Sequence, residues 1–220
     1  MLLHYDEFVS PIGRILFASD GEAVCALDYA GYETRMSMLL ARHYDAVEFE
    51  RRSDPMGLKR VLKSYFAGDL HAFDAVPVCT GGTTFQESVW KALRTIPAGE
   101  TQSYGELARR LNRPKAARAV GHANSLNPVA IIVPCHRVIG ASAALTGYAG
   151  GLERKHWLLS HEGARAPRCL TQSERPNDAE RDAGHHQPDA GNNGGGRHRQ
   201  QLERPASGEL PAGRQKIANA

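Results

Sequence analysis

The chemistry of this sequence centres on Cys135, which lies in the run Ile132-Val133-Pro134-Cys135-His136-Arg137-Val138. A cysteine attacks as its thiolate, and because its free pKa is about 8.5 it needs a base or a cation nearby. His136 and Arg137 follow directly in the chain. We therefore predict that Cys135 is a nucleophile and that His136 removes its proton, against the alternative of one more buried, inert cysteine.

A catalytic histidine is normally oriented by a third group. Glu162 is a candidate, and from the sequence alone Glu153 or Asp74 would serve as well. The apolar run from Val129 to Val133 predicts a buried extended segment that ends at Cys135. Because neighbouring side chains on such a segment point to opposite sides, the histidine would need a bridging water or a turn to reach the thiol.

Several helices are predicted around this segment. The capping box Ser103-Tyr104-Gly105-Glu106 opens a short helix through Leu111, and another helix follows over about 115–124. Two short helices joined by a tight turn are typical of a helix-turn-helix. A longer helix begins at the capping box Thr84-Phe85-Gln86-Glu87, and the last one covers 152–161.

The charge distribution around the two short helices favours a polyanionic partner. No Asp or Glu lies between Glu106 and Glu153, whereas Lys and Arg occur there repeatedly, and a local basic patch is typical of nucleic-acid binding. The alternative is a solvated basic face. The second short helix has mostly small residues and Arg118, which suits a close, sequence-independent approach to DNA, although small residues also serve tight helix packing. The basic residues of this window are Arg109, Arg110, Arg113, Lys115, Arg118 and Arg137.

Composition limits the remaining possibilities. The chain has 220 residues and a net charge of only +3, so one large or two small domains fit. Its four cysteines show no CxxC spacing, no run approaches a membrane span, and the N-terminus lacks the features of a signal peptide. We expect a cytoplasmic protein without membrane contact.

The sequence divides into three parts. Strands are expected over 2–9, 13–18 and 23–29, with helices over 34–44 and 57–66, so residues 1–78 form a small α/β unit. Residues 79–167 hold the cysteine and the predicted helix-turn-helix. Residues 168–220 contain no Phe, Tyr or Trp, and we predict that this tail is disordered.

The motifs of the second part resemble those of the DNA–protein-cysteine alkyltransferases, which repair O6-alkylguanine. The likeness runs in register over about residues 80–163 and more loosely through Ser10-Pro11-Ile12-Gly13 and Tyr65-Phe66-Ala67-Gly68. The motifs that carry it are Pro134-Cys135-His136-Arg137-Val138, Trp90-Lys91-Ala92-Leu93, Ile96-Pro97-Ala98-Gly99, Ser103-Tyr104-Gly105-Glu106-Leu107-Ala108, Ala117-Arg118-Ala119-Val120-Gly121, Gly147-Tyr148-Ala149-Gly150-Gly151-Leu152 and His161-Glu162-Gly163.

The resemblance implies a fold, a reaction and a set of roles. The N-terminal part would be ribonuclease H-like, and the small-faced helix would enter the minor groove of double-stranded DNA. Cys135 would accept the alkyl group once and irreversibly, after the damaged base has been flipped out of the stack. His136 would take the thiol proton through a water, Glu162 would hold the imidazole, and Asn127 would tie the cysteine segment to the helix-turn-helix.

The remaining roles concern the substrate. Tyr104 would donate a hydrogen bond to the guanine ring, and Arg118 would fill the space left by the flipped base. Tyr148 and Ala149 would line the pocket, with backbone groups of the glycine loop reading the base edge. The residues expected at the substrate and DNA are Ser103, Tyr104, Arg118, Tyr148, Ala149 and Gly150.

Departures from the family pattern matter as well. Some relatives carry Ser where Ala149 stands, so one hydrogen bond to the base would be missing. The N-terminal four-cysteine zinc module of the adaptive-response relatives is absent, which implies a stand-alone repair protein, expected to be a monomer without cofactor. Nothing in the spacing of Cys25, Cys79, His43 and His71 supports a metal site, and none is expected.

Two rival functions remain. A DNA-lesion binder without activity would lack the acceptor cysteine, which is present here. A thiol hydrolase that turns over would use Cys135 and His136 but would not need a helix-turn-helix or a basic window free of acidic residues. Whether O4-alkylthymine is also a substrate stays open.

Overall fold

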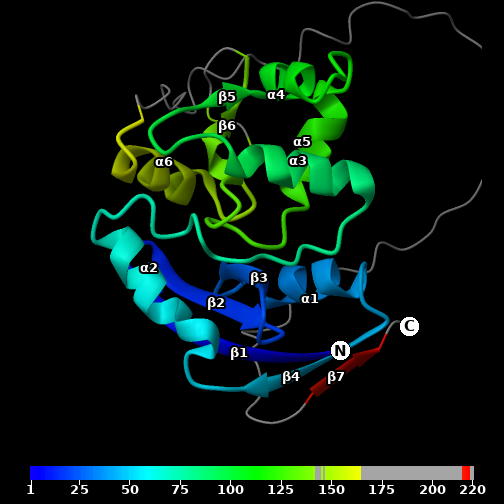
Figure 1. Cartoon of the computed structure of the whole chain (residues 1–220), viewed down its shortest axis with the longest axis vertical. Helices are drawn as coiled ribbons and strands as arrows, with labels where there is room; N and C mark the ends of the chain where they lie inside the picture. Colours follow the sequence, from blue (N-terminus) through cyan, green and yellow to red (C-terminus); the bar gives the residue numbers. More distant parts are fainter. Residues whose placement is uncertain (142–144, 146, 165–214, 219–220) are drawn as a thin grey trace, which may run out of the picture.

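A computed structural model describes residues 1–141, 145, 147–164 and 215–218 of the chain. In this part a five-stranded sheet, in the order β3-β2-β1-β4-β7, lies beside a group of helices formed by residues 84–161 (Figure 1). The protein is thus a mixed α/β fold. None of its described helices has the length and apolar composition needed to span a bilayer.

The predicted N-terminal meander is confirmed. Strands β1 (Leu2–Ser10), β2 (Gly13–Ser19) and β3 (Val24–Tyr29) pair antiparallel in sequence order. The first turn is tight because Ser10 pairs with Gly13, whose φ of +105° is open to glycine at little strain.

Two strands of the five-stranded sheet were not predicted. Strand β4 (Ala46–Arg51) alternates buried Val47 and Phe49 with polar residues and pairs parallel to β1. Strand β7 (Gln215–Ala218) pairs antiparallel with β4, so the prediction of a disordered tail over 168–220 is wrong for these four residues. An edge strand offers unpaired backbone N–H and C=O groups, and pairing satisfies them. The rest of that prediction lies outside the described residues.

Two helices accompany the sheet. Helix α1 (Glu33–Ala41) connects β3 to β4 and turns Met36, Leu39 and Leu40 inward. A 3₁₀ turn, η1 (Pro55–Gly57), leads into α2 (Leu58–Phe66), which ends just before Gly68 as predicted.

The second part is mainly helical. Its helices are α3 (Thr84–Arg94), α4 (Tyr104–Arg110), α5 (Ala117–Ser125) and α6 (Leu152–His161). The capping box of α4 is confirmed at Ser103 and Glu106. That of α3 lies one residue earlier than predicted, because Thr83 is the N-cap and pairs with Gln86. Strands β5 (Gln102–Ser103) and β6 (Val138–Ile139) form a short parallel pair.

The expected extended segment before Cys135 is wrong. Residues 130–133 form turns, and the cysteine begins a 3₁₀ turn, η2 (Cys135–Arg137). Ile131 has a φ of +68°, a strained conformation for a β-branched residue. Its burial and the polar contacts of Asn127 hold this turn in place. An apolar run alone cannot distinguish such a buried turn from a strand.

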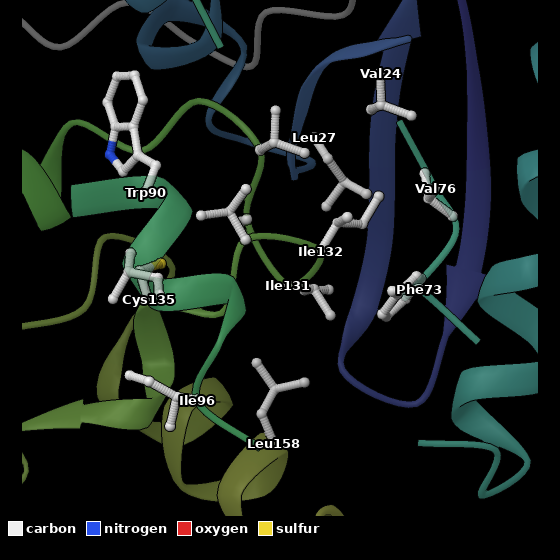
Figure 2. Packing of buried hydrophobic residues seen from close by; sticks show 14 of the residues in the cluster. Val24, Leu27, Phe73, Val76, Trp90, Ile96, Ile131, Ile132, Cys135 and Leu158 are labelled. Carbon is white, nitrogen blue, oxygen red and sulfur yellow. The ribbon is translucent and has the colours of Figure 1, made fainter. Parts of the chain in front are cut away.

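One hydrophobic core extends across the predicted division at residues 78 and 79. Figure 2 shows Val24 and Leu27 of β3 in the same cluster as Trp90, Ile131 and Cys135. Backbone pairing also joins the two parts, because Leu27 forms a β-bridge with Val129. The reactive segment is therefore packed between the two parts.

Candidate functional site

Cys135 lies in a cavity of about 290 Å³ at the end of helix α5. Its side chain is almost wholly buried, and this burial raises the pKa of the thiol, with hydrogen bonding from Asn127 acting in the opposite direction. Cys135 is thus protonated at rest, so a base must remove the thiol proton before the sulfur can attack. The cavity is lined by Asp28, Arg35, Tyr104, Gly121, Asn124, Ser125, Asn127, Ala130, Cys135, Gly147, Tyr148, Ala149 and Gly150.

Two asparagines fix the backbone around the cysteine. Asn127 donates its amide nitrogen to the carbonyl oxygens of Val133 at 2.8 Å and Val129 at 3.3 Å, and its Oδ1 accepts from the Val129 N–H at 3.0 Å. Asn124, on α5, donates from Nδ2 to the carbonyl oxygen of Cys135 at 3.3 Å. These contacts join the turn that carries the thiol to helix α5 and the residues that follow it.

His136 is fully buried beside the cysteine and contacts Glu162. Its Nε2 lies 3.0 Å from Glu162 Oε1, while Nδ1 is buried and has no partner among the described residues. Burial lowers the pKa of His136, and Glu162 offsets this only in part. The imidazole is therefore neutral at neutral pH, as a base requires, and its unpartnered Nδ1 can accept a proton.

Of the orienting groups considered, the structure brings Glu162 to the histidine. Glu153 is exposed at the start of α6, and exposed Asp74 pairs with His71 at 2.9 Å. Glu162 also binds Arg137, with Nε to Oε2 at 2.9 Å and Nη2 to Oε1 at 2.8 Å. Despite its burial, these cationic and hydrogen-bonding partners hold the pKa of Glu162 well below its usual range.

Sequence reasoning missed other members of this network. The hydroxyl of Tyr65, on α2, donates to Glu162 Oε1 at 2.8 Å, and Arg137 also donates to the carbonyl oxygen of Ile96. Lys155, on α6, is fully buried and donates to the carbonyl oxygen of Val138 at 2.6 Å. Burial lowers its pKa to about 8, and a Cys135 thiolate would raise it. Of these residues, only Arg137 gives a signal in the sequence, because it directly follows His136.

Several predicted pocket residues do line the cavity. Tyr104, at the start of α4, lies against Gly121, where an added Cβ would come within 3.6 Å of its ring. Tyr148, Ala149 and Gly150 form another wall. We conclude that the cavity brings a reactive thiol, aromatic side chains and backbone groups together.

Comparison with known proteins agrees with this geometry. The family model for the DNA-binding domain of 6-O-methylguanine DNA methyltransferase matches residues 84–164. Methylated-DNA–protein-cysteine methyltransferase of Shigella flexneri is 50% identical over 161 residues, which is 72% of this chain and 94% of that relative. The chain belongs to the methylated-DNA–protein-cysteine methyltransferase family. It is therefore a methyltransferase of this class, which confirms the resemblance seen in its motifs.

Solved structures match about three quarters of this methyltransferase chain. The structure described as Mycobacterium tuberculosis OGT in complex with DNA has a TM-score of 0.63 and 48% identity, over 74% of this chain and 95% of that one. The O6-methylguanine-DNA methyltransferase of Pyrococcus kodakaraensis has a TM-score of 0.58 and 27% identity, over 74% and 99% of the two chains. The likeness thus includes the N-terminal sheet.

Of the residues expected at the substrate and DNA, Ser103 and Arg118 do not line the cavity of this methyltransferase. Ser103 caps α4, where its hydroxyl accepts from the Glu106 N–H and Glu106 accepts from the Ser103 N–H. Arg118 is exposed on α5. Neither therefore contacts the buried thiol, and any role of theirs must lie at the molecular surface.

The N-terminal part of the methyltransferase contributes more to the site than sequence reasoning found. Arg35 of α1 forms an ion pair with Asp28 and donates to the carbonyl oxygens of Ser125 at 2.9 Å and Asn127 at 3.2 Å. The end of α5 is thus attached to the sheet. Because this contact joins residues about ninety positions apart, no local pattern could reveal it.

Two other features do not include Cys135. A larger cavity, of about 630 Å³, lies between residues 70–77 and 94–98 and is also lined by Ile131, Ile132, Pro134 and Arg137. Cys25 and Cys79 meet Asp20, with their ligand atoms within 4.8 Å of one another, although their spacing predicted no cluster. Neither His43 nor His71 belongs to it. Burial, and then the Asp20 charge, raise the pKa of Cys25 to about 12. The expected absence of a metal stays a prediction.

Proposed function

We propose that this chain repairs DNA by moving the alkyl group of O6-alkylguanine to Cys135, once per molecule. The observation that carries the proposal is the buried series Cys135, His136 and Glu162, in which the thiol lines the cavity and the imidazole is neutral. The relatives named for this reaction, and one of them described in complex with DNA, support it.

The proposed transfer balances as follows. His136 takes the Cys135 proton through a bound water, and the thiolate sulfur attacks the alkyl carbon. A carbon–sulfur bond forms as the carbon–oxygen bond breaks, and the electron pair stays on the departing guanine. Tyr104 donates a hydrogen bond to the guanine ring, and the ring takes up a proton from water as the carbon–oxygen bond breaks, while His136 returns the Cys135 proton to water. The thioether is not cleaved again, so the protein is consumed.

The proposed DNA contact uses α4 and α5 as a helix-turn-helix. The turn between them is tight, because Asn112 has a φ of +57° and Arg113 donates its N–H to the carbonyl oxygen of Ala108. The exposed side chains of Arg109, Arg113, Lys115 and Arg118 supply positive charge on this side. Helix α5 would enter the minor groove, and Arg118 would replace the flipped base.

Asn127 and the pocket residues complete the proposal. Asn127 positions the cysteine turn, while Tyr148, Ala149 and Gly150 receive the base. Ser103 would act at the DNA backbone. We also retain the ribonuclease H-like description of the sheet, the division near residue 79, a monomeric state and a cytoplasmic location as predictions.

The decisive experiment counts label per protein. A duplex with labelled O6-methylguanine is mixed with the protein, and label on protein and in free product is measured. Transfer that stops near one label per molecule supports the proposal. Continued release of free product would indicate a thiol hydrolase, and tight binding without transfer would indicate a lesion binder.

A pair of variants identifies the acceptor. Cys135→Ala should abolish transfer while leaving binding to the duplex. Cys79→Ala removes a thiol outside the cavity and should transfer like the parent protein. Transfer by Cys135→Ala would mean that another cysteine is the acceptor.

A further inference from the structure

Asn124 presents an unpaired acceptor beside the reactive cysteine. The residue lines the 290 Å³ cavity and is only 5% exposed. Its Nδ2 donates to the Cys135 carbonyl oxygen at 3.3 Å, whereas its Oδ1 is buried and has no hydrogen-bond partner among the described residues. Folded proteins almost always pair such atoms, so this one needs an explanation.

The orientation of this amide is set by its neighbour. Turning the amide over would place Oδ1 against the Cys135 carbonyl oxygen, and two acceptors would then face each other. The nitrogen therefore faces Cys135 and the oxygen faces away from that carbonyl. An acceptor held in this way selects a ligand that brings a hydrogen-bond donor.

Other amide and hydroxyl groups of the cavity wall are already engaged. Both ends of the Asn127 amide bind the backbone of the cysteine turn. The Ser125 hydroxyl donates to the carbonyl oxygen of His122 at 2.7 Å. Asn124 Oδ1 is thus a buried side-chain acceptor of this wall that has no partner in the described part of the chain.

The two candidate lesions differ in such a donor. In O6-alkylguanine the edge that carries the alkyl group also carries the 2-amino group, and the ring nitrogen between them has no proton. In O4-alkylthymine the same edge offers only acceptors. Cys135 and Asn124 line the same cavity and are hydrogen-bonded to each other, so a base whose alkyl group faces Cys135 Sγ can bring the rest of that edge close to Asn124.

We propose that Asn124 Oδ1 accepts a hydrogen bond from the 2-amino group of O6-alkylguanine. This contact makes the pocket favour guanine lesions over O4-alkylthymine, and the inference rests on the proposed function. A site built to pair a donor discriminates against an analogue that lacks it, because its own acceptor then stays buried and unpaired.

The test removes the 2-amino group from the lesion and, separately, the Asn124 acceptor from the protein. Single-turnover transfer is measured from duplexes with O6-methylguanine and with O6-methylhypoxanthine, which lacks only the 2-amino group. The parent protein should react about tenfold more slowly with the hypoxanthine lesion. Asn124→Leu has no acceptor and should react with both lesions at similar rates. If the variant keeps the parent's ratio, other groups read the amino group and the inference is wrong.

Further variants distinguish loss of the Asn124 acceptor from a general disturbance of the cavity wall. Asn124→Asp keeps an acceptor but loses the donor to the Cys135 carbonyl, and it should retain discrimination even if transfer is slow. Ser125→Ala changes the same wall without touching a free acceptor, and its ratio should equal the parent's. Loss of the ratio in Asn124→Asp would overturn the inference.

The same measurements separate the two proposals. Absence of any transfer from O6-methylguanine by the parent protein would remove the proposed function itself. Normal transfer by the parent, with equal rates on both lesions, would remove only the role of Asn124. The parent should also prefer O6-methylguanine to O4-methylthymine, and Asn124→Leu should narrow that preference.

Discussion

The hydroxyl of Tyr29, on strand β3, lies 2.9 Å from the hydroxyl of Tyr148 in the wall of the cysteine cavity. The two rings meet edge to face, and the guanidinium of Arg154 stacks 4.5 Å above the Tyr29 ring. Arg154 also donates to the carbonyl oxygens of Ile12 and Gly150. The N-terminal sheet thus holds the loop that forms one side of the pocket.

Removing this hydrogen bond should slow transfer. Tyr29→Phe keeps the ring but leaves the Tyr148 hydroxyl without this partner, which should lower the free energy of unfolding by about 1 kcal/mol. Single-turnover transfer should slow because the pocket wall is less fixed, while duplex affinity stays unchanged. Tyr32→Phe removes the hydroxyl of the neighbouring tyrosine ring and is the matched control. Equal transfer rates for both variants and the parent would contradict this role.

Gly150 should not tolerate even one added carbon. A Cβ at this position would lie 2.3 Å from Tyr29 Cε2 and 2.8 Å from Tyr148 Cε1. Gly150→Ala should therefore displace the loop, reduce transfer strongly and cost about 1–3 kcal/mol of stability. Gly105→Ala is the control, because its Cβ has nothing nearer than 4.0 Å and a helical alanine should add up to about 1 kcal/mol. Urea unfolding and transfer rates check both, and parental behaviour of Gly150→Ala would be inconsistent with the packing.

Local signals predicted the helices well but not the site. Helix α6 has its predicted bounds, and the capping box at Ser103 marks the start of α4, because these signals lie within a few residues. The turn before Cys135 depends instead on the Asn127 amide and on a left-handed Ile131. Neither feature can be recognised from the apolar residue pattern, so the segment was predicted as extended.

Long-range pairing explains the remaining differences. Glu162 was one of three candidate partners for His136, and only the fold places it within 3.0 Å. Tyr65 and Tyr29 bring polar groups from the N-terminal part, where sequence reasoning found no chemistry. Such contacts are set by how elements pack, which spacing along the chain does not encode.

Replacing Glu162 should destabilise the protein strongly. Its side chain is fully buried and carries the only carboxylate that the described residues place against both His136 and Arg137. Glu162→Gln would leave the buried guanidinium without a counter-charge, which should cost about 3–5 kcal/mol. Lys91→Ala breaks an exposed pair with Glu87 and should change stability by less than about 0.5 kcal/mol. Denaturant unfolding of both variants measures the contrast, and similar values would argue against a buried charge network.

The transfer rate should fall in acid with a midpoint below the ordinary histidine value. Burial lowers the pKa of His136 from 6.5, so the neutral base persists to lower pH and is lost only as pH falls through the lowered pKa. Single-turnover rates between about pH 5 and 8 locate this midpoint. Because the Glu162 charge raises the pKa of His136, Glu162→Gln should move the midpoint lower still. A parental midpoint above 6.5, or an upward shift in the variant, would contradict the buried neutral imidazole.

Arg118 should matter for duplex DNA more than for single strands. In the proposed complex it fills the space of the flipped base, and a single strand has no such space. Arg118→Ala should weaken duplex binding, reduce its salt slope by about one and slow transfer from the duplex. Transfer from a single-stranded oligonucleotide with the same lesion should change little. Arg60→Ala removes another exposed charge, from α2, and should leave transfer from both substrates unaffected. Equal slowing of Arg118→Ala on both substrates would show that the side chain serves general phosphate attraction instead of base replacement.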